Sequence, residues 1–314
     1  MKVYDRYGRE INNLRIIITT QCNYNCIFCH SEGYYHCSRR NSFYLNPKEV
    51  ELIGNVAIHL GIDKVKITGG EPLLHTDICG VVRVLKDLGF SDISMVTNGY
   101  YLASFAEKLK DSGLERVNIN IPSLRESKYS YITGTKNALT RVIEGVKIAK
   151  EAGLYPVKIN VVILRDINDD EWPRFIDFAR KMGVYLQFIE YHSSDASNDD
   201  FKRFYRPIDD IEKYLVEHAE KIFIRPMHHR RRYILEDGTN IDIVRPMFNP
   251  EFCMNCSRIR ATPTGWKPCL LTNEIIDYTQ ELEQRDVIGL TKKLLKAIRI
   301  RKPFFEEENK QEGI

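Results

Sequence analysis

Short β-branched segments alternate with longer amphipathic segments from Leu14 to about Glu190, and this alternation constrains the fold of the 314-residue chain most strongly. Strands that alternate with helices predict a parallel sheet covered by the helices. About six such units predict a partial (β/α)6 barrel of the TIM type. The predicted strands are 15–19, 64–68, 93–97, 116–121, 157–164 and 184–190. The predicted helices are 47–60, 77–88, 102–111, 137–152 and 169–182, and several end in a glycine.

The pattern changes after Glu190, where a polar stretch at 193–200 predicts a loop. Beyond it we expect a smaller α+β region. Its predicted elements are a helix at 207–220, strands at 221–225, 231–235 and 240–244, a hairpin turn at 236–238 and a basic helix near 286–300. We therefore divide the chain into a barrel region at 1–225 and a C-terminal region at 226–314.

Polar residues recur at every second position of three predicted strands. Side chains two residues apart lie on the same face of a strand. Parallel sheets are normally apolar on both faces, so these pairs predict a concave face that lines a ligand cavity. Frayed strand ends in solvent are the alternative. The pairs are Lys64 and Lys66, Asn118 and Asn120, and Lys158 and Asn160.

Six of the eight cysteines form two triplets. The first, Cys22, Cys26 and Cys29, follows the first predicted strand with the spacing C-x3-C-x2-C. Three thiolates can hold three irons of a four-iron cluster and leave the fourth iron open to a ligand. A structural zinc site with His30 as the fourth ligand is the alternative. The remaining cysteines, Cys37 and Cys79, are predicted to be ordinary thiols.

The second triplet, Cys253, Cys256 and Cys269, also lacks an obvious fourth protein ligand, and both zinc and a second iron-sulfur cluster fit its spacing. Arg258 and Arg260 follow Cys256 closely. Guanidinium groups beside a metal site fit an anionic substrate, especially a phosphate, and solvated surface charges are the alternative.

The net charge of +3 is too small to indicate nucleic acid or a membrane as a partner. The sequence has no stretch of about 20 apolar residues. We expect a cytoplasmic protein.

The first triplet, with Phe28 just before its last cysteine, resembles the defining motif of the radical S-adenosylmethionine superfamily. The segment 68–73, Thr-Gly-Gly-Glu-Pro-Leu, is similar to the one that holds the methionine amino group in that superfamily, although taken alone it also fits a turn. The resemblance implies a four-iron cluster that binds S-adenosylmethionine and cleaves it reductively to a 5′-deoxyadenosyl radical.

Further motifs resemble the GTP 3′,8-cyclase family of molybdenum cofactor (molybdopterin) biosynthesis over about residues 5–275. These motifs are Lys-Ile-Asn-Val-Val at 158–162, Phe-Ile-Glu at 188–190 and Phe-Cys-x2-Cys-Ser-Arg-Ile-Arg at 252–260. The resemblance implies a lyase with two four-iron clusters, of which the second, on Cys253, Cys256 and Cys269, meets the guanine base. We also expect an external electron donor and a homodimer.

The resemblance also assigns roles to residues. The cluster formed by Cys22, Cys26 and Cys29 would be catalytic. Contacts to S-adenosylmethionine would come from Phe28, Gly69, Gly70, Glu71, Asn120 and His192. Contacts to GTP would come from Arg15, Lys64, Lys66, Thr97, Lys158, Arg258, Ile259 and Arg260.

Several positions depart from the family pattern. Gln187 stands where an arginine usually binds triphosphate, Lys66 replaces another arginine, and Asn120 and His192 replace serine and methionine. The family's Gly-Gly terminus is absent, since the chain ends in Gln-Glu-Gly-Ile at 311–314. We expect the basic run 228–232 to be a solvated strand edge, with a phosphate or subunit contact as the alternative.

Two other functions remain open at this stage. One is a radical S-adenosylmethionine enzyme that modifies a peptide and carries one auxiliary cluster. The other is a zinc-stabilised binding module without catalysis.

Overall fold

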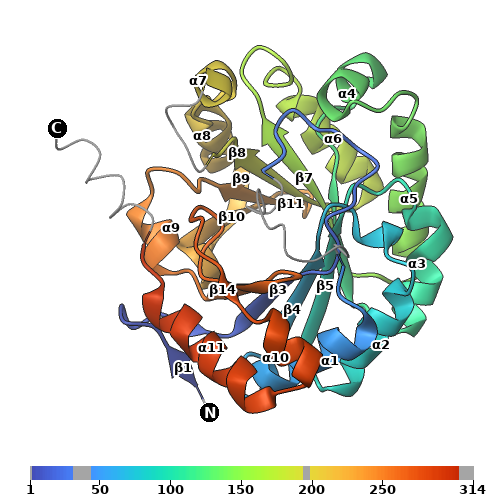
Figure 1. The fold of residues 1–314 in the computed structure, drawn as a ribbon. Helices are drawn as coiled ribbons and strands as arrows, with labels where there is room; N and C mark the ends of the chain where they lie inside the picture. The colour runs from blue at the N-terminus through green and yellow to red at the C-terminus, as the bar shows by residue number, and fades with distance from the viewer. Residues whose placement is uncertain (1, 31–43, 194–198, 304–314) are drawn as a thin grey trace.

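The structure is a computed structural model that describes residues 2–30, 44–193 and 199–303. Its parallel strands follow one another in chain order and form the predicted partial barrel (Figure 1). These strands are β3 (Asn13–Ile17), β4 (Lys64–Thr68), β5 (Asp92–Thr97), β6 (Arg116–Asn120), β7 (Val157–Ile163) and β8 (Tyr185–Glu190). The alternation of segment types therefore predicted all of them.

Helices cover the outside of this sheet (Figure 1). They are α1 (Pro47–His59), α2 (Ile78–Asp87), α3 (Leu102–Asp111), α5 (Leu139–Glu151) and α6 (Trp172–Met182). At the start of α1 the Asn46 side chain accepts hydrogen bonds from the backbone of Lys48 and Glu49, and Glu49 accepts one from the Asn46 backbone, which is a capping box. The predicted glycine caps are confirmed, because Gly61, Gly89, Gly113, Gly153 and Gly183 all have positive φ.

Strands of the C-terminal region extend the same sheet at both edges. β12 (Arg258–Ala261) pairs in parallel with β3, and β11 (Asn240–Val244) pairs in parallel with β8. The 12-stranded sheet has the order β14-β13-β12-β3-β4-β5-β6-β7-β8-β11-β10-β9. The boundary placed after residue 225 falls between β9 (Ala219–Arg225) and β10 (Arg230–Leu235), which pair with each other. The division into two regions stays a prediction.

The other predicted C-terminal elements are largely present. The structure has α8 (Asp209–His218) and α11 (Val287–Ile300), and Gly238 forms the predicted turn between β10 and β11 with a φ of 81°. Residues 194–198 of the predicted loop lie outside the described residues. Residues 199 and 200, which we also assigned to the loop, begin α7 (Asp199–Phe204) instead.

The remaining short elements complete the described fold. At the amino end β1 (Val3–Tyr4) pairs with β2 (Glu10–Ile11). The others are the turns η2 (Pro72–Leu74) and η3 (Met227–His229), the helices α9 (Pro250–Met254) and α10 (Thr279–Gln284), and the strands β13 (Gly265–Lys267) and β14 (Ile276–Asp277). Among the described helices, none combines the length and the apolar character needed to cross a membrane.

Four of the described helices were not predicted, namely α4 (Glu126–Thr133), α7, α9 and α10, and α4 is the one beside the first cysteine triplet. The segment α4 (Glu126–Thr133) is rich in serine, tyrosine and β-branched residues, which have weak helix propensity. Its buried residues, Tyr129, Ile132 and Thr133, hold it in place by packing. A short helix stabilised mainly by tertiary contacts leaves little pattern in the sequence.

The prediction of a solvated strand edge for the run 228–232 is wrong. β10 lies between β9 and β11, so it is an internal strand. His228 is buried, Arg230 and Arg232 are half-buried, and Arg231 is exposed. Internal strands alternate between two faces, and a run of like residues in the sequence hides that alternation.

A buried carboxylate ties the two ends of the described chain together. Oδ2 of Asp5 accepts hydrogen bonds from Nε of Arg9 and Nη1 of Arg301, each at 2.7 Å, and all three side chains are almost fully buried. The arginines in turn donate to the backbone carbonyls of Cys253 and Cys256, at 2.9 Å in both cases. The position of the second cysteine triplet therefore depends on Asp5.

We expect Asp5→Ala to lower the free energy of unfolding by about 3 to 5 kcal/mol, because it leaves two buried guanidinium groups without their carboxylate. Urea denaturation followed by circular dichroism measures the change. Asp177→Ala removes a carboxylate whose ion pair with Arg180 is solvent-exposed, and it should cost less than about 1 kcal/mol. Equal stability of the Asp5 variant and the wild type would contradict this assignment.

Candidate functional site

A cavity of about 1040 Å³ lies inside the partial barrel, and both cysteine triplets line it. Most of the other predicted site residues line it too. They are Arg15, Phe28, Lys64, Lys66, Gly69, Gly70, Thr97, Asn120, Lys158, His192, Arg258 and Arg260. Glu71 and Ile259 are the exceptions. The strands thus bring together residues that are up to about 250 positions apart.

The loop that carries the first triplet is anchored by α4. The backbone N–H groups of Asn25 and Ile27 donate to the carbonyls of Thr133 and Ile132, each at 3.0 Å. A tight turn follows, in which the backbone of Cys29 donates to the carbonyl of Cys26. Helix α4, which the sequence analysis missed, therefore holds the cysteine loop at the cavity.

The Gly-Gly pair fits tightly against the start of this loop. The backbone N–H of Gly70 donates to the carbonyl of Thr19 at 2.8 Å. A Cβ atom at Gly69 would lie 2.4 Å from the Thr19 carbonyl oxygen, and one at Gly70 would lie 2.2 Å from that of Gln21. Only glycine allows this approach of two backbones, which fixes the end of β4 beside the cysteine loop.

Glu71 braces the loops around the cavity. Its Oε1 atom accepts hydrogen bonds from Oγ1 of Thr97 and the backbone of Leu73, and its Oε2 atom accepts one from the backbone of Asn98 at 2.7 Å. Burial raises the pKa of Glu71 to about 7, although these hydrogen bonds oppose the rise. We predicted direct contact between Glu71 and S-adenosylmethionine; Glu71 is not among the residues that line the cavity, and the contact stays a prediction.

Asn98 extends this brace to the cysteine loop, since its Nδ2 atom donates to Oδ1 of Asn23 at 2.8 Å. The sequence analysis did not single out Asn98, although it follows Thr97 directly. The rings of His30 and His192, which both line the cavity, lie 4.9 Å apart. Of the two isolated cysteines, Cys79 is half-buried on α2, while Cys37 lies outside the described residues, as do the chain's last residues.

The second triplet repeats the turn of the first, because the backbone of Cys256 donates to the carbonyl of Cys253 at 3.1 Å. Its electrostatic surroundings differ. Burial alone would raise the pKa of Cys256, but the guanidinium groups of Arg301 and Arg258 lower it below its ordinary value. At Cys22 and Cys26, burial and the neighbouring thiols raise the pKa.

The donor sets fit iron-sulfur clusters. Ligands of one zinc ion must all lie about 2.3 Å from it, whereas each cysteine of a four-iron cluster binds a different iron. In the parts of the chain that the structure describes, no three histidine, cysteine or acidic side chains converge as ligands of one ion. The cluster irons would also offset the mutual repulsion of the thiolates at Cys22, Cys26 and Cys29.

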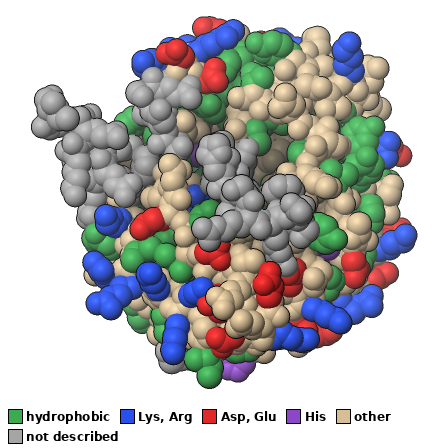
Figure 2. Space-filling model, viewed as in Figure 1, with side chains coloured by type: hydrophobic (Ala, Val, Ile, Leu, Met, Phe, Trp, Pro, Cys, Tyr) green, Lys and Arg blue, Asp and Glu red, His purple; other side chains and the backbone are tan. Residues whose placement is uncertain are grey.

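Cations from adjacent strands lie side by side in the cavity wall. In the register of β12, β3 and β4, Arg260 lies opposite Arg15, and Arg15 lies opposite Lys66. Like charges directly opposite each other destabilise a sheet. On the face shown in Figure 2 basic and acidic side chains are interspersed around the periphery, whereas the residues that line the cavity include far more lysines and arginines than acidic residues.

The orientation of the Ile259 side chain follows from the same strand geometry. Period two on β12 turns Arg258 and Arg260 toward the cavity and Ile259 into the core, where its side chain is fully buried. We predicted a GTP contact for Ile259; its side chain does not line the cavity, and the contact stays a prediction.

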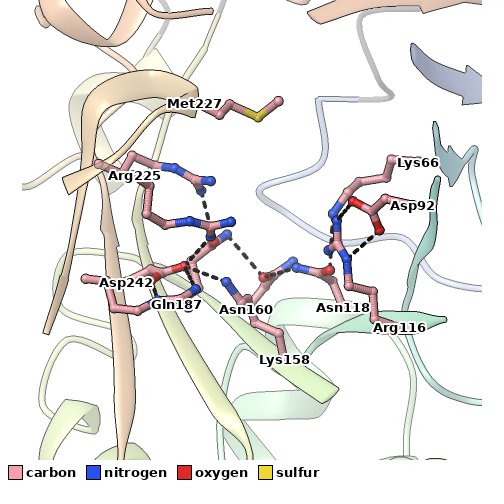
Figure 3. Close-up of polar contacts among 12 residues, drawn as sticks. Lys66, Asp92, Arg116, Asn118, Lys158, Asn160, Gln187, Arg225, Met227 and Asp242 are labelled. Carbon is pink, nitrogen blue, oxygen red and sulfur yellow. Dashed lines mark hydrogen bonds and ion pairs between the residues drawn. The ribbon is translucent and has the colours of Figure 1, made fainter. Parts of the chain in front are cut away.

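Members of the predicted polar pairs are joined across the strands by hydrogen bonds between side-chain amides, which we call the amide chain (Figure 3). Oδ1 of Asn160 accepts hydrogen bonds from Nε2 of Gln187 at 3.2 Å and from Nδ2 of Asn118 at 3.4 Å. Lys66 donates to Asn118 at one end, and Arg230 donates to Gln187 at the other, both at 3.1 Å. These residues lie within the cavity wall, so the prediction of a polar concave face is confirmed.

Among the described residues, several cations of the cavity wall donate hydrogen bonds only to neutral groups. The hydrogen bonds of Lys66, Arg230 and Arg258 go to Asn118, Gln187 and the sulfur of Met227, respectively. Burial, and then the neighbouring cations Arg116 and Arg15, lower the pKa of Lys66 well below its usual value. A bound polyanion would relieve this repulsion.

Other cations are held by one buried carboxylate, Asp242, which accepts from Lys158, Arg225 and Arg232 (Figure 3). Burial would raise the pKa of Asp242, but these three cations hold it well below its usual range. The sequence analysis missed Asp242 and Arg225, and it gave a phosphate contact for the run that contains Arg230 only as the alternative. The alternation on strand 240–244 was visible, but nothing in it indicated that Asp242 faces the cations of β7 and β10.

The similarity of this chain to known proteins agrees with the residues found at the site. Residues 16–179 match the Radical SAM superfamily, and residues 184–307 match Molybdenum Cofactor Synthesis C. A probable GTP 3′,8-cyclase of Methanothermobacter marburgensis is 41% identical over 98% of this chain and 100% of its own length. That of Methanocaldococcus jannaschii is 40% identical over 96% of this chain and 99% of its own length.

Solved structures share the fold. The crystal structure of Streptococcus suis SuiB bound to S-adenosylmethionine superposes with a TM-score of 0.66 at 16% identity, covering 90% of this chain and 66% of SuiB. The resemblance seen in the sequence motifs is confirmed by the curated relatives, since the identity extends over nearly the full length of both chains. The chain belongs to the GTP 3′,8-cyclase family of the radical S-adenosylmethionine superfamily.

Proposed function

We propose that this protein is a radical S-adenosylmethionine GTP 3′,8-cyclase, which converts GTP to (8S)-3′,8-cyclo-7,8-dihydroguanosine 5′-triphosphate in molybdenum cofactor biosynthesis. The observation that carries the proposal is the convergence of both cysteine triplets and a cluster of cations on one cavity. The full-length similarity to probable GTP 3′,8-cyclases supports it.

Membership of the superfamily implies one four-iron cluster and S-adenosylmethionine. When bound, they would supply a 5′-deoxyadenosyl radical, which is the reagent needed to remove the ribose C3′ hydrogen of GTP. Cys22, Cys26 and Cys29 would hold this cluster. Phe28, Gly69, Gly70, Asn120 and His192 would surround S-adenosylmethionine, and Glu71 would fix the loops from outside the cavity.

Cys253, Cys256 and Cys269 would hold a second four-iron cluster, which binds the guanine base. The phosphates of GTP would lie against the cations of the wall. Arg258 and Arg260 project from β12 beside this triplet, and Lys66 and Arg15 continue the positive surface across β3 and β4. Lys64, Thr97 and Lys158 line the same cavity, and Ile259 would contribute through its backbone.

Both triplets must border the same cavity, because a carbon radical is too reactive to diffuse from one site to another. Such chemistry requires that bulk water and side reactions be excluded from the cavity while the radical exists. A peptide substrate would not require so many cations, so the cavity favours GTP over the peptide-modifying alternative. The external electron donor and the homodimer stay predictions.

Iron content tests the two-cluster assignment. Anaerobically reconstituted wild type should contain about eight irons per chain, and Cys256→Ala should contain about four because it removes a ligand of the second cluster alone. Cys79→Ala is the matched control and should keep the wild-type content. Zinc in place of iron would support the binding module and end the enzymatic proposal.

The combined substitution of Arg258 and Arg260 by alanine should abolish GTP binding and cyclisation while cleavage of S-adenosylmethionine continues without product. Losing both charge-assisted contacts should cost on the order of 3 to 6 kcal/mol of binding free energy. Calorimetry with GTP and chromatography of both products measure the two effects. Arg299→Ala, on the exposed side of α11, serves as the control. An unchanged affinity for GTP would refute the assigned role.

A further inference from the structure

Arg230 begins β10 and lies in the cavity wall, whereas its neighbour Arg231 is exposed and pairs with Glu212 at 3.5 Å. The alternation of the strand separates these adjacent arginines onto different faces. Arg230 comes from the C-terminal region and reaches the cavity beside β8. It belongs to the basic run that the sequence analysis expected in solvent.

The partners of Arg230 differ from those of the other arginines on β9 and β10. Arg225 and Arg232 both donate to the carboxylate of Asp242. Among the described residues, Arg230 has no carboxylate within ion-pair distance; it donates from Nη1 to the neutral Oε1 of Gln187, and its buried Nε atom has no hydrogen-bond partner. A half-buried guanidinium group with a spare N–H is costly unless an anion binds it.

Gln187 occupies the position on β8 where the motif resemblance implies an arginine that binds triphosphate. Both polar atoms of its side chain take part in the amide chain, because Oε1 accepts a hydrogen bond from Arg230 and Nε2 donates one to Asn160. An arginine at 187 has no acceptor and would place a second positive charge beside Arg230. Gln187 and Arg230 therefore form one hydrogen-bonded pair, in which the positive charge is on β10 and the β8 residue is neutral.

We propose that Arg230 binds a phosphate group of the substrate and supplies the guanidinium group that position 187 lacks. The proposal rests on the proposed function, and it makes Arg230 a determinant of specificity for the triphosphate rather than for the nucleoside. The amide chain from Gln187 through Asn160 and Asn118 to Lys66 fixes two phosphate-binding cations at its two ends. Such preorganisation reduces the entropy lost on binding.

The test compares the affinity of the reconstituted enzyme for GTP, guanosine and inorganic tripolyphosphate. Arg230→Gln keeps an N–H donor for Gln187 but removes the charge, so it tests the charge even if Arg230→Ala fails to fold. We expect either variant to bind GTP and tripolyphosphate about 10- to 100-fold more weakly, with the affinity for guanosine unchanged. Arg231→Ala, the matched control, should stay within about twofold of the wild type for all three.

Rescue provides a second readout that a merely structural role would not give. Adding Gln187→Arg to Arg230→Gln restores a guanidinium group to the same place and should recover most of the affinity for GTP. Gln187→Arg alone should bind GTP no better than the wild type, because the two arginines compete for one site. Cleavage of S-adenosylmethionine should continue in every variant.

Two results would overturn the assignment. One is wild-type affinity for GTP and tripolyphosphate in Arg230→Gln, and the other is an equal loss of affinity for GTP and guanosine. The proposed function fails separately, if wild type forms no cyclised product from GTP under reducing, oxygen-free conditions. Tripolyphosphate binding that depends on Arg230 would then leave the phosphate site standing without the cyclase.

Discussion

The parallel pairing of β12 with β3 is the contact on which the candidate site depends. It inserts a strand from the end of the chain beside the first strand of the barrel and puts Arg260 opposite Arg15. The second cysteine triplet precedes and follows β12, so the pairing also sets its position. At the other edge β11 pairs with β8 and brings in Asp242 and Arg230. A partial barrel has two open edges, and here both are used to build the cavity wall.

This arrangement concentrates cations at the expense of stability. Rows of like charge across β12, β3 and β4 oppose sheet formation. The surrounding core compensates for this repulsion, because the strands are otherwise flanked by fully buried aliphatic residues such as Leu14, Ile16 and Ile67. Asp242 neutralises the cations Lys158, Arg225 and Arg232 of β7, β9 and β10. The row of cations on β12, β3 and β4 is the part of the wall best suited to phosphate groups.

The sequence was sufficient for the barrel because period and composition are local properties. The six barrel strands, the cavity-facing polar pairs and both cysteine triplets could be predicted from segments of fewer than 20 residues, whereas β12, which pairs in parallel with β3, was not predicted. The contacts that complete the site are not local. Asp5 meets Arg301 across almost the whole chain, and Asp242 meets Lys158 only because β11 pairs with β8. No single segment contains that information.

Tertiary partners also decide what a recognised motif can do. The contact between Glu71 and S-adenosylmethionine stays a prediction, because the backbone N–H groups of Leu73 and Asn98 and the hydroxyl of Thr97 already bind its carboxylate. The basic run on β10 looked like a solvent-exposed edge because its neighbour β11 was not known to join the barrel. In both cases the local motif was recognised correctly, but it did not reveal the tertiary partners of the side chain.

The two cysteine loops share a turn but are anchored by different means, and this difference separates their chemistry. Neutral backbone groups of α4 and the Gly-Gly segment hold the first loop, so its thiols lie in surroundings that do not favour extra negative charge. Arginines hold the second loop, with Arg9 and Arg301 on its carbonyls and Arg258 beside Cys256. A polyanionic substrate is therefore attracted toward the second triplet and away from the first. Under the proposed function, radical formation at the first triplet and phosphate binding beside the second would thus take place in different parts of one cavity.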